Sequence, residues 1–135
     1  MKLTVLCLLL LSACEITAAR NYRTYALTWT CLSAEGCERT EQVALIDRAK
    51  IFDEYDVIEF LVTRDDRFDE GAQMVASDEL PAECSWLYSF NLFTHELGPA
   101  RLCRTSGGFE LELSIPDRDP ATQSKWLVEG RELDP

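Results

Sequence analysis

The sequence contains a single histidine, His95, and a catalytic site built on it would need a nucleophile and an orienting acid close by. No G-x-S-x-G motif supplies a serine nucleophile. His95 stands beside Glu96 at the end of an expected strand, which is typical of a surface histidine. We therefore predict that the protein has no catalytic residues and is not an enzyme.

Acidic residues gather in two places, and calcium is the metal that such oxygen-rich clusters could bind. The first cluster contains Asp53, Glu54 and Asp56, and the second contains Asp65, Asp66, Asp69 and Glu70. In the second cluster, Arg67 stands at an alternate position where a calcium loop would have Asp or Asn, and Arg64 adds another cation. We therefore expect a solvated charged loop over residues 64–71, and we predict neither a metal nor a cofactor.

Four cysteines follow the N-terminal segment: Cys31, Cys37, Cys84 and Cys103. In an exported domain they predict two disulfides, for which three connectivities are possible. We favour Cys31–Cys37 with Cys84–Cys103, because the members of each pair are closest in sequence. Each bridge would then stabilise the fold by about 2–3 kcal/mol. A zinc site is the alternative, but it lacks the paired C-x-x-C spacing that signals one.

Three tryptophans fall on the expected faces of strands and are predicted to pack in the core: Trp29, Trp86 and Trp126. Trp126 is the one that we place nearest a binding surface, because it lies close to the loop over residues 116–120. The prolines at both ends of this loop keep it out of a central strand. The possible binding surface is therefore formed by Trp126, Asp117 and Asp119.

The N-terminus has the organisation of a secretory signal peptide. Lys2 supplies the positive charge, and an apolar run over residues 3–11 is interrupted only by Thr4. The run is shorter than the roughly 20 apolar residues that a spanning helix needs. The next residues, Leu11-Ser12-Ala13-Cys14, resemble the lipobox of bacterial lipoproteins at every position. This resemblance implies cleavage before Cys14, acyl chains on Cys14 and attachment to a membrane.

Two further features concern the destination of the protein. Lipoproteins of the resembled family commonly stay in the inner membrane when Asp follows the cysteine, so Glu15 favours the outer membrane. The alternative is a soluble secreted protein beginning at Arg20, because Thr17-Ala18-Ala19 fits ordinary signal cleavage. Segments 107–116 and 126–130 also look like parts of uncharacterised lipoproteins from myxobacteria, which implies the same location and no particular activity.

The size and charge of the chain limit its partners. Cleavage before Cys14 removes 13 of the 135 residues and leaves 122, which suits one compact domain. The net charge of the whole chain is −11, and removing Lys2 makes it −12. Nucleic acid is disfavoured because phosphate binding needs clustered Lys and Arg. Membrane attachment would depend on the acyl chains of Cys14 for the same reason.

Hydrophobic residues recur at every second position in several segments, as in Phe109, Leu111, Leu113 and Ile115. We expect strands over 25–31, 56–63, 72–76, 84–94, 100–104, 109–115 and 125–131. Residues 42–50 fit either a strand or a short helix capped by Thr40, and we favour the strand. The sequence therefore predicts an all-β fold, an antiparallel β-sandwich of seven to eight short strands, with a small barrel as the alternative.

The expected organisation is a signal peptide over residues 1–13, a lipidated N-terminus and tether over 14–22, and a single β domain over 23–135. Our first hypothesis is a membrane-anchored lipoprotein of the bacterial envelope that acts through contacts with an unidentified protein partner. The alternative is an acidic binder of a cationic protein, similar to a lysozyme inhibitor, which the negative charge favours. A secreted hydrolase is the third hypothesis and has the least support.

Overall fold

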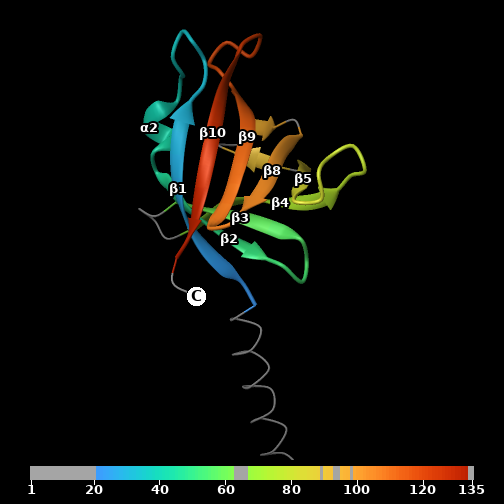
Figure 1. Cartoon of the computed structure of the whole chain (residues 1–135). Helices are drawn as coiled ribbons and strands as arrows, with labels where there is room; N and C mark the ends of the chain where they lie inside the picture. The colour runs from blue at the N-terminus through green and yellow to red at the C-terminus, as the bar shows by residue number, and fades with distance from the viewer. Residues whose placement is uncertain (1–20, 63–66, 89, 93–94, 98, 134–135) are drawn as a thin grey trace, which may run out of the picture.

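The computed structural model (Figure 1) describes residues 21–62, 67–88, 90–92, 95–97 and 99–133, and these are almost entirely β-strand. The main sheet contains β1 Arg23–Cys31, β2 Ile46–Phe52, β3 Val57–Val62, β4 Arg67–Ala76, β5 Cys84–Tyr88, β8 Ala100–Thr105, β9 Gly108–Pro116 and β10 Gln123–Glu132. A separate two-stranded sheet contains β6 Phe90–Leu92 and β7 His95–Leu97, and the helix α2 Thr40–Val43 precedes β2.

The eight strands of the main sheet close into an antiparallel barrel. They follow one another in chain order around the wall, with the β6–β7 hairpin inserted between β5 and β8. The first strand closes the barrel because β1 pairs with β2 on one side and with β10 on the other, as Figure 1 shows for β1 and β10. The all-β prediction is confirmed, and of the two architectures considered the structure has the barrel instead of the two-sheet sandwich.

The interior of the barrel is filled by apolar side chains. Residues alternate along each strand, so that Phe109, Leu111, Leu113 and Ile115 of β9 are buried while Glu110 is exposed. The largest fully buried side chains are those of Phe60, Phe109, Ile46, Ile51, Ile58 and Leu87. An eight-stranded barrel is just wide enough for side chains to fill or to hold one small ligand. Here the buried apolar side chains that the structure describes form one core cluster, which leaves the outer surface for contact with a partner.

Phe109 and Gly130 illustrate how closely this interior is packed. Phe109 is 1% exposed, and its ring meets that of Tyr25 edge to face at a centroid distance of 5.1 Å. The two residues Phe109 and Gly130 are direct partners on β9 and β10. A Cβ atom placed on Gly130 would lie 2.3 Å from Cε1 of the Phe109 ring. The aromatic ring therefore occupies the space that a side chain at position 130 would need.

Both predicted disulfides are confirmed. Cys31 and Cys37 join the end of β1 to the segment before α2, with an S–S distance of 2.03 Å. Cys84 and Cys103 are direct partners on β5 and β8, with an S–S distance of 2.02 Å. The first bridge closes a connection at one end of the barrel, and the second links two neighbouring strands of the wall.

Three strand predictions need correction. Residues 67–71 belong to β4 and not to a charged loop, because this segment pairs with β3 despite its charges. Residues 42–50 divide between α2 and β2, since the chain makes one helical turn before Ile46 enters the barrel. The single strand expected over 84–94 is interrupted after Tyr88, where the chain leaves the barrel wall to form the β6–β7 hairpin.

The inward face of β5 also differs from the expectation. Trp86 was predicted to pack in the core, but Leu87 is fully buried, whereas Trp86 is half-buried and its neighbour Tyr88 is 43% exposed. Because side chains alternate along a strand, burial of Leu87 places both aromatic rings on the outer wall. Trp86 is therefore a surface-facing tryptophan.

Candidate functional site

The sequence singles out Trp126, Asp117 and Asp119 as a binding surface, and the structure places Trp126 inside the barrel. Trp126 is 3% exposed, and its ring meets that of Trp29 edge to face at a centroid distance of 6.0 Å. The Trp29 indole donates a hydrogen bond of 2.6 Å to the Ile46 carbonyl. Trp126 Nε1 is buried and finds no acceptor among the described residues. Trp126 is therefore part of the core, and the prediction that it lies on a binding surface is wrong.

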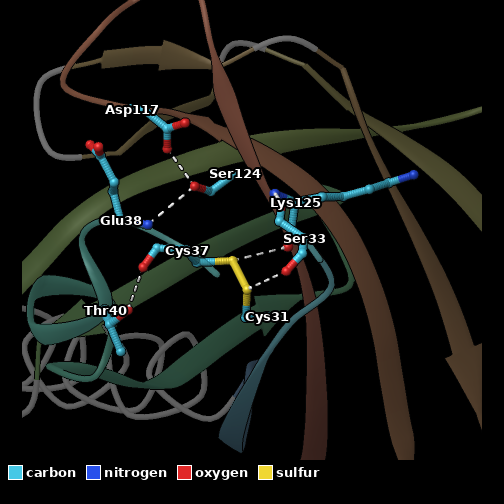
Figure 2. Close-up of a disulfide and its surroundings, with 8 residues drawn as sticks. All are labelled: Cys31, Ser33, Cys37, Glu38, Thr40, Asp117, Ser124 and Lys125. Carbon is cyan, nitrogen blue, oxygen red and sulfur yellow. Dashed lines mark hydrogen bonds between the residues drawn. A yellow bond between two sulfur atoms is a disulfide. The ribbon is translucent and has the colours of Figure 1, made fainter. Parts of the chain in front are cut away.

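Asp117 fastens the β9–β10 loop to the connection that contains the Cys31–Cys37 disulfide, as Figure 2 shows. Its carboxylate accepts a hydrogen bond from the buried hydroxyl of Ser124. The same hydroxyl accepts a bond of 3.2 Å from the backbone N–H of Glu38. The Glu38 carboxylate in turn accepts a bond of 2.7 Å from the backbone N–H of Arg118. This network ties two chain segments together, and sequence reasoning missed Ser124 because an isolated serine carries no pattern.

Asp119 has a local structural role in the same loop. Its carboxylate accepts a hydrogen bond of 3.0 Å from the backbone N–H of Ala121, and its carbonyl accepts one of 3.1 Å from Thr122. This is the way in which Asp side chains commonly stabilise turns. Asp117 and Asp119 thus share a loop, but Trp126 faces the opposite way, and the three do not form one exposed surface.

A second group of exposed carboxylates lies at the other end of the barrel. The β2–β3 turn and the β4–β5 loop share this end, because alternate connections of a barrel in chain order lie on the same side. We call it the acidic end and define it by six exposed carboxylates, those of Asp53, Glu54, Asp56, Asp78, Glu79 and Glu83. Sequence analysis recognised only the first three as a cluster, because the other three are distant along the chain.

Arg104 links the two segments of the acidic end. Its guanidinium pairs with the Asp53 carboxylate at 2.9 Å, and its backbone N–H donates a bond of 2.8 Å to the Glu83 carbonyl. Arg23 also pairs with Asp53, at 3.8 Å. Among the described residues, Asp53 is the only one of the six carboxylates that is ion-paired. The other five therefore present a net negative charge to the solvent.

The backbone of the β2–β3 turn is held in one conformation. The Asp56 carbonyl accepts hydrogen bonds of 2.7 Å from the Met74 N–H and of 3.0 Å from the Gln73 side chain. The Gln73 side chain also donates a hydrogen bond of 3.0 Å to the Tyr55 carbonyl. Asp56 has φ of 51°, in the left-handed region that Asp tolerates better than most residues. Tyr55 stands 67% exposed between two acids. The turn thus offers an aromatic ring and charges on a fixed frame.

Several residues considered from the sequence are not placed by the structure. Cys14 and the signal peptide lie outside the described residues, as do Arg64, Asp65 and Asp66. His95 begins β7, and its side chain is not described. Among the described residues, no group of three His, Cys, Asp or Glu side chains could hold a metal ion. In the same part of the chain, no helix is long and apolar enough to cross a membrane.

Comparison of the chain with family models, with curated proteins and with solved structures found no match in any of the three.

Proposed function

We propose that this protein is a lipid-anchored component of the bacterial envelope that acts by protein–protein contact and without catalysis. The N-terminal resemblance to lipoproteins supports the anchor at Cys14 and a place in the outer membrane. The two disulfides suit an oxidising compartment. The filled interior of the barrel supports a function exerted from the outer surface.

The observation that carries this proposal is the acidic end. Five exposed carboxylates that form no ion pair with a described cation create a local negative field on turns whose backbone is fixed. Such a field attracts a positively charged surface and increases the rate of association. Tyr55 adds a residue type that is enriched in protein interfaces. These features favour a cationic protein as the partner, so the inhibitor-like binder becomes the more specific form of the proposal.

The proposed anchor would keep this surface close to the membrane. Eight residues, 15–22, separate Cys14 from β1, and an extended chain of that length reaches at most about 28 Å. The described chain enters the barrel at Arg23, which pairs with Asp53 at the acidic end. The partner would therefore be a protein that lies at the membrane surface.

Variants in which carboxylates are replaced by neutral amides test the acidic end. The first variant combines Glu54→Gln, Asp56→Asn, Asp78→Asn and Glu79→Gln. The control combines Glu35→Gln, Glu41→Gln, Glu110→Gln and Glu129→Gln, which removes the same charge from exposed positions elsewhere. Binding of lysozyme, a small basic protein, is measured by calorimetry at two salt concentrations. At about 0.5 kcal/mol for each exposed charge, the first variant loses about 2 kcal/mol, or about 30-fold in affinity.

The control variant separates a local surface from net charge. We expect it to lose about threefold or less, because its four charges lie on the wall and at the opposite end, outside the acidic end, and salt screens charges at a distance. Equal losses in the two variants would mean that lysozyme responds to net charge alone, which contradicts a defined acidic surface. Binding that does not weaken with salt would also contradict the proposal.

The anchor is tested separately by the intact mass of the protein purified from its native membrane. A mass that begins at Cys14, includes acyl groups and increases by four hydrogens when the two disulfides are reduced would support it. An unacylated mass that begins at Arg20 would overturn the lipid anchor and leave a diffusible binder.

A further inference from the structure

A hollow of about 400 Å³ lies on the outer wall of the barrel, across β5, β8, β9 and β10. The side chains that shape it are those of Trp86, Arg101, Glu112, Ser114, Gln123 and Lys125. Trp86, Arg101 and Glu112 stand side by side on three neighbouring strands, and Ser114 is the direct partner of Lys125. We call this hollow the wall groove. It begins beside Gln123, at the opposite end of the barrel from the acidic end.

The wall groove combines an aromatic side with groups that mainly donate hydrogen bonds. Arg101 pairs with Glu112 at 3.4 Å, so these two charges largely offset each other. Lys125 pairs with no carboxylate among the described residues, and Figure 2 shows its side chain extending away from the disulfide. None of the hydrogen bonds between described residues uses the Trp86 indole N–H or the Gln123 side chain. Arg101 and Lys125 against Glu112 thus give the described lining of the groove a net positive charge, on a chain whose net charge is −11.

We infer that the wall groove binds a saccharide that carries a carboxylate. Trp86 is half-buried in the lining of the groove, and an indole ring can pack against the C–H side of a sugar ring. Ser114, Gln123 and the guanidinium of Arg101 supply partners for hydroxyl groups, and Lys125 supplies a cation for the carboxylate. The volume lies in the range of ligand sites, of about 300–1,000 Å³. The polar lining disfavours an apolar ligand.

This inference goes beyond the proposed function and does not depend on it, because the wall groove and the acidic end share no residue. Two kinds of glycan contain a sugar ring that carries a carboxylate. In a cell-wall glycan the carboxylate belongs to a lactyl ether on the ring, and in an acidic polysaccharide it belongs to a uronic acid. The probes therefore include one compound of each kind. They are the disaccharide of N-acetylglucosamine and N-acetylmuramic acid, and digalacturonic acid, with the neutral disaccharide N,N′-diacetylchitobiose as the control ligand.

The test measures binding of each probe to the mature, exported protein by NMR titration. The variants are Trp86→Ala and Lys125→Gln. Their matched controls are Tyr55→Ala, an exposed aromatic at the acidic end, and Arg131→Gln, an exposed outward cation on the same strand as Lys125. Thermal melting confirms that each variant is folded. We expect each groove variant to lower the affinity for the acidic probe by about tenfold, because it removes either a charge-assisted hydrogen bond or a stacked ring.

The outcomes separate the possibilities. Binding of either acidic probe, weakened by both groove variants and by neither control, supports the inference, and the probe that binds identifies the source. Equal binding of N,N′-diacetylchitobiose would overturn the role of the carboxylate. No binding of any probe at millimolar concentration would overturn a saccharide site, as would tighter binding of a short peptide through its C-terminal carboxylate. Loss of lysozyme binding alone concerns the acidic end and leaves the wall groove unaffected.

Discussion

Replacement of Gly130 by alanine tests whether the interior of the barrel is as closely packed as it appears. A Cβ at this position would lie 2.3, 2.5 and 2.7 Å from three atoms of the Phe109 ring. The ring has little room to move, because Phe109 is 1% exposed and packs edge to face against Tyr25. A hollow barrel that holds a ligand would instead let the ring rotate away. The substitution therefore distinguishes a filled interior from one that can open.

The expected magnitude follows from the known cost of overpacking. Extra atoms forced into a well-packed core typically destabilise by about 1–3 kcal/mol. Alanine restricts the unfolded chain more than glycine does, which offsets about 0.4–1 kcal/mol at unstrained positions. We therefore expect Gly130→Ala to lower the free energy of unfolding by about 1–2 kcal/mol, measured by urea denaturation. For a domain of this size, the corresponding decrease in Tm is about 4–10 °C.

Two further variants make this prediction specific. Gly107 lies in the β8–β9 turn, where a Cβ would meet nothing within 4 Å, so Gly107→Ala should leave stability unchanged or slightly raised. Phe109→Leu makes room for the new methyl group, so the double variant should be more stable than the sum of the single effects by about 1 kcal/mol. A Gly130→Ala protein as stable as the wild type, or a strictly additive double variant, would refute the reasoning.

Two other predictions concern aromatic residues. Burial, with a smaller contribution from Glu132, raises the pKa of Tyr25 above its ordinary value of 10.0. The folded state thus holds the phenol proton more tightly, so stability is full below about pH 10 and is lost as pH rises through the raised pKa. Tyr25→Phe should reduce the alkaline decline in urea melts between about pH 9 and 11, and an unchanged decline would contradict this origin. Trp29→Phe should lower the free energy of unfolding by about 1–2 kcal/mol more than Trp126→Phe does. Of the two indoles, only that of Trp29 has an acceptor among the described residues, at 2.6 Å. Equal losses of stability in urea denaturation would contradict a decisive role of this hydrogen bond.

The alternation of residues predicted most strands, and the cysteines predicted the bridges. Phe109 to Ile115 alternate cleanly with polar residues, and the structure buries those four apolar side chains. Closure of the sheet could not be predicted in the same way, because strands with one buried face have the same pattern in a sandwich and in a barrel. What distinguishes the two is the pairing of β1 with β10, residues about 100 positions apart in sequence, and no local pattern records such a contact.

Errors on the outer wall have a common physical cause. In β5 the larger ring of Trp86 was assigned to the core, yet the neighbouring Leu87 is the side chain that faces it. A shift of one residue exchanges the two faces of a strand. Because the chain leaves the barrel after Tyr88, the strand is too short for its alternation to show which face is buried. The acidic end was missed for another reason. Its two halves, around residues 54 and 79, meet only because of the barrel topology.

The most direct test of the proposed contact surface is site-specific photocrosslinking in the native envelope. A photoreactive p-benzoylphenylalanine would replace Tyr55, which is 67% exposed at the acidic end, or Leu32, which is 43% exposed at the opposite end. We predict a discrete crosslinked adduct with a basic protein from position 55, weaker at high salt, and none from position 32. An adduct that forms from position 32 and not from position 55 would contradict the account.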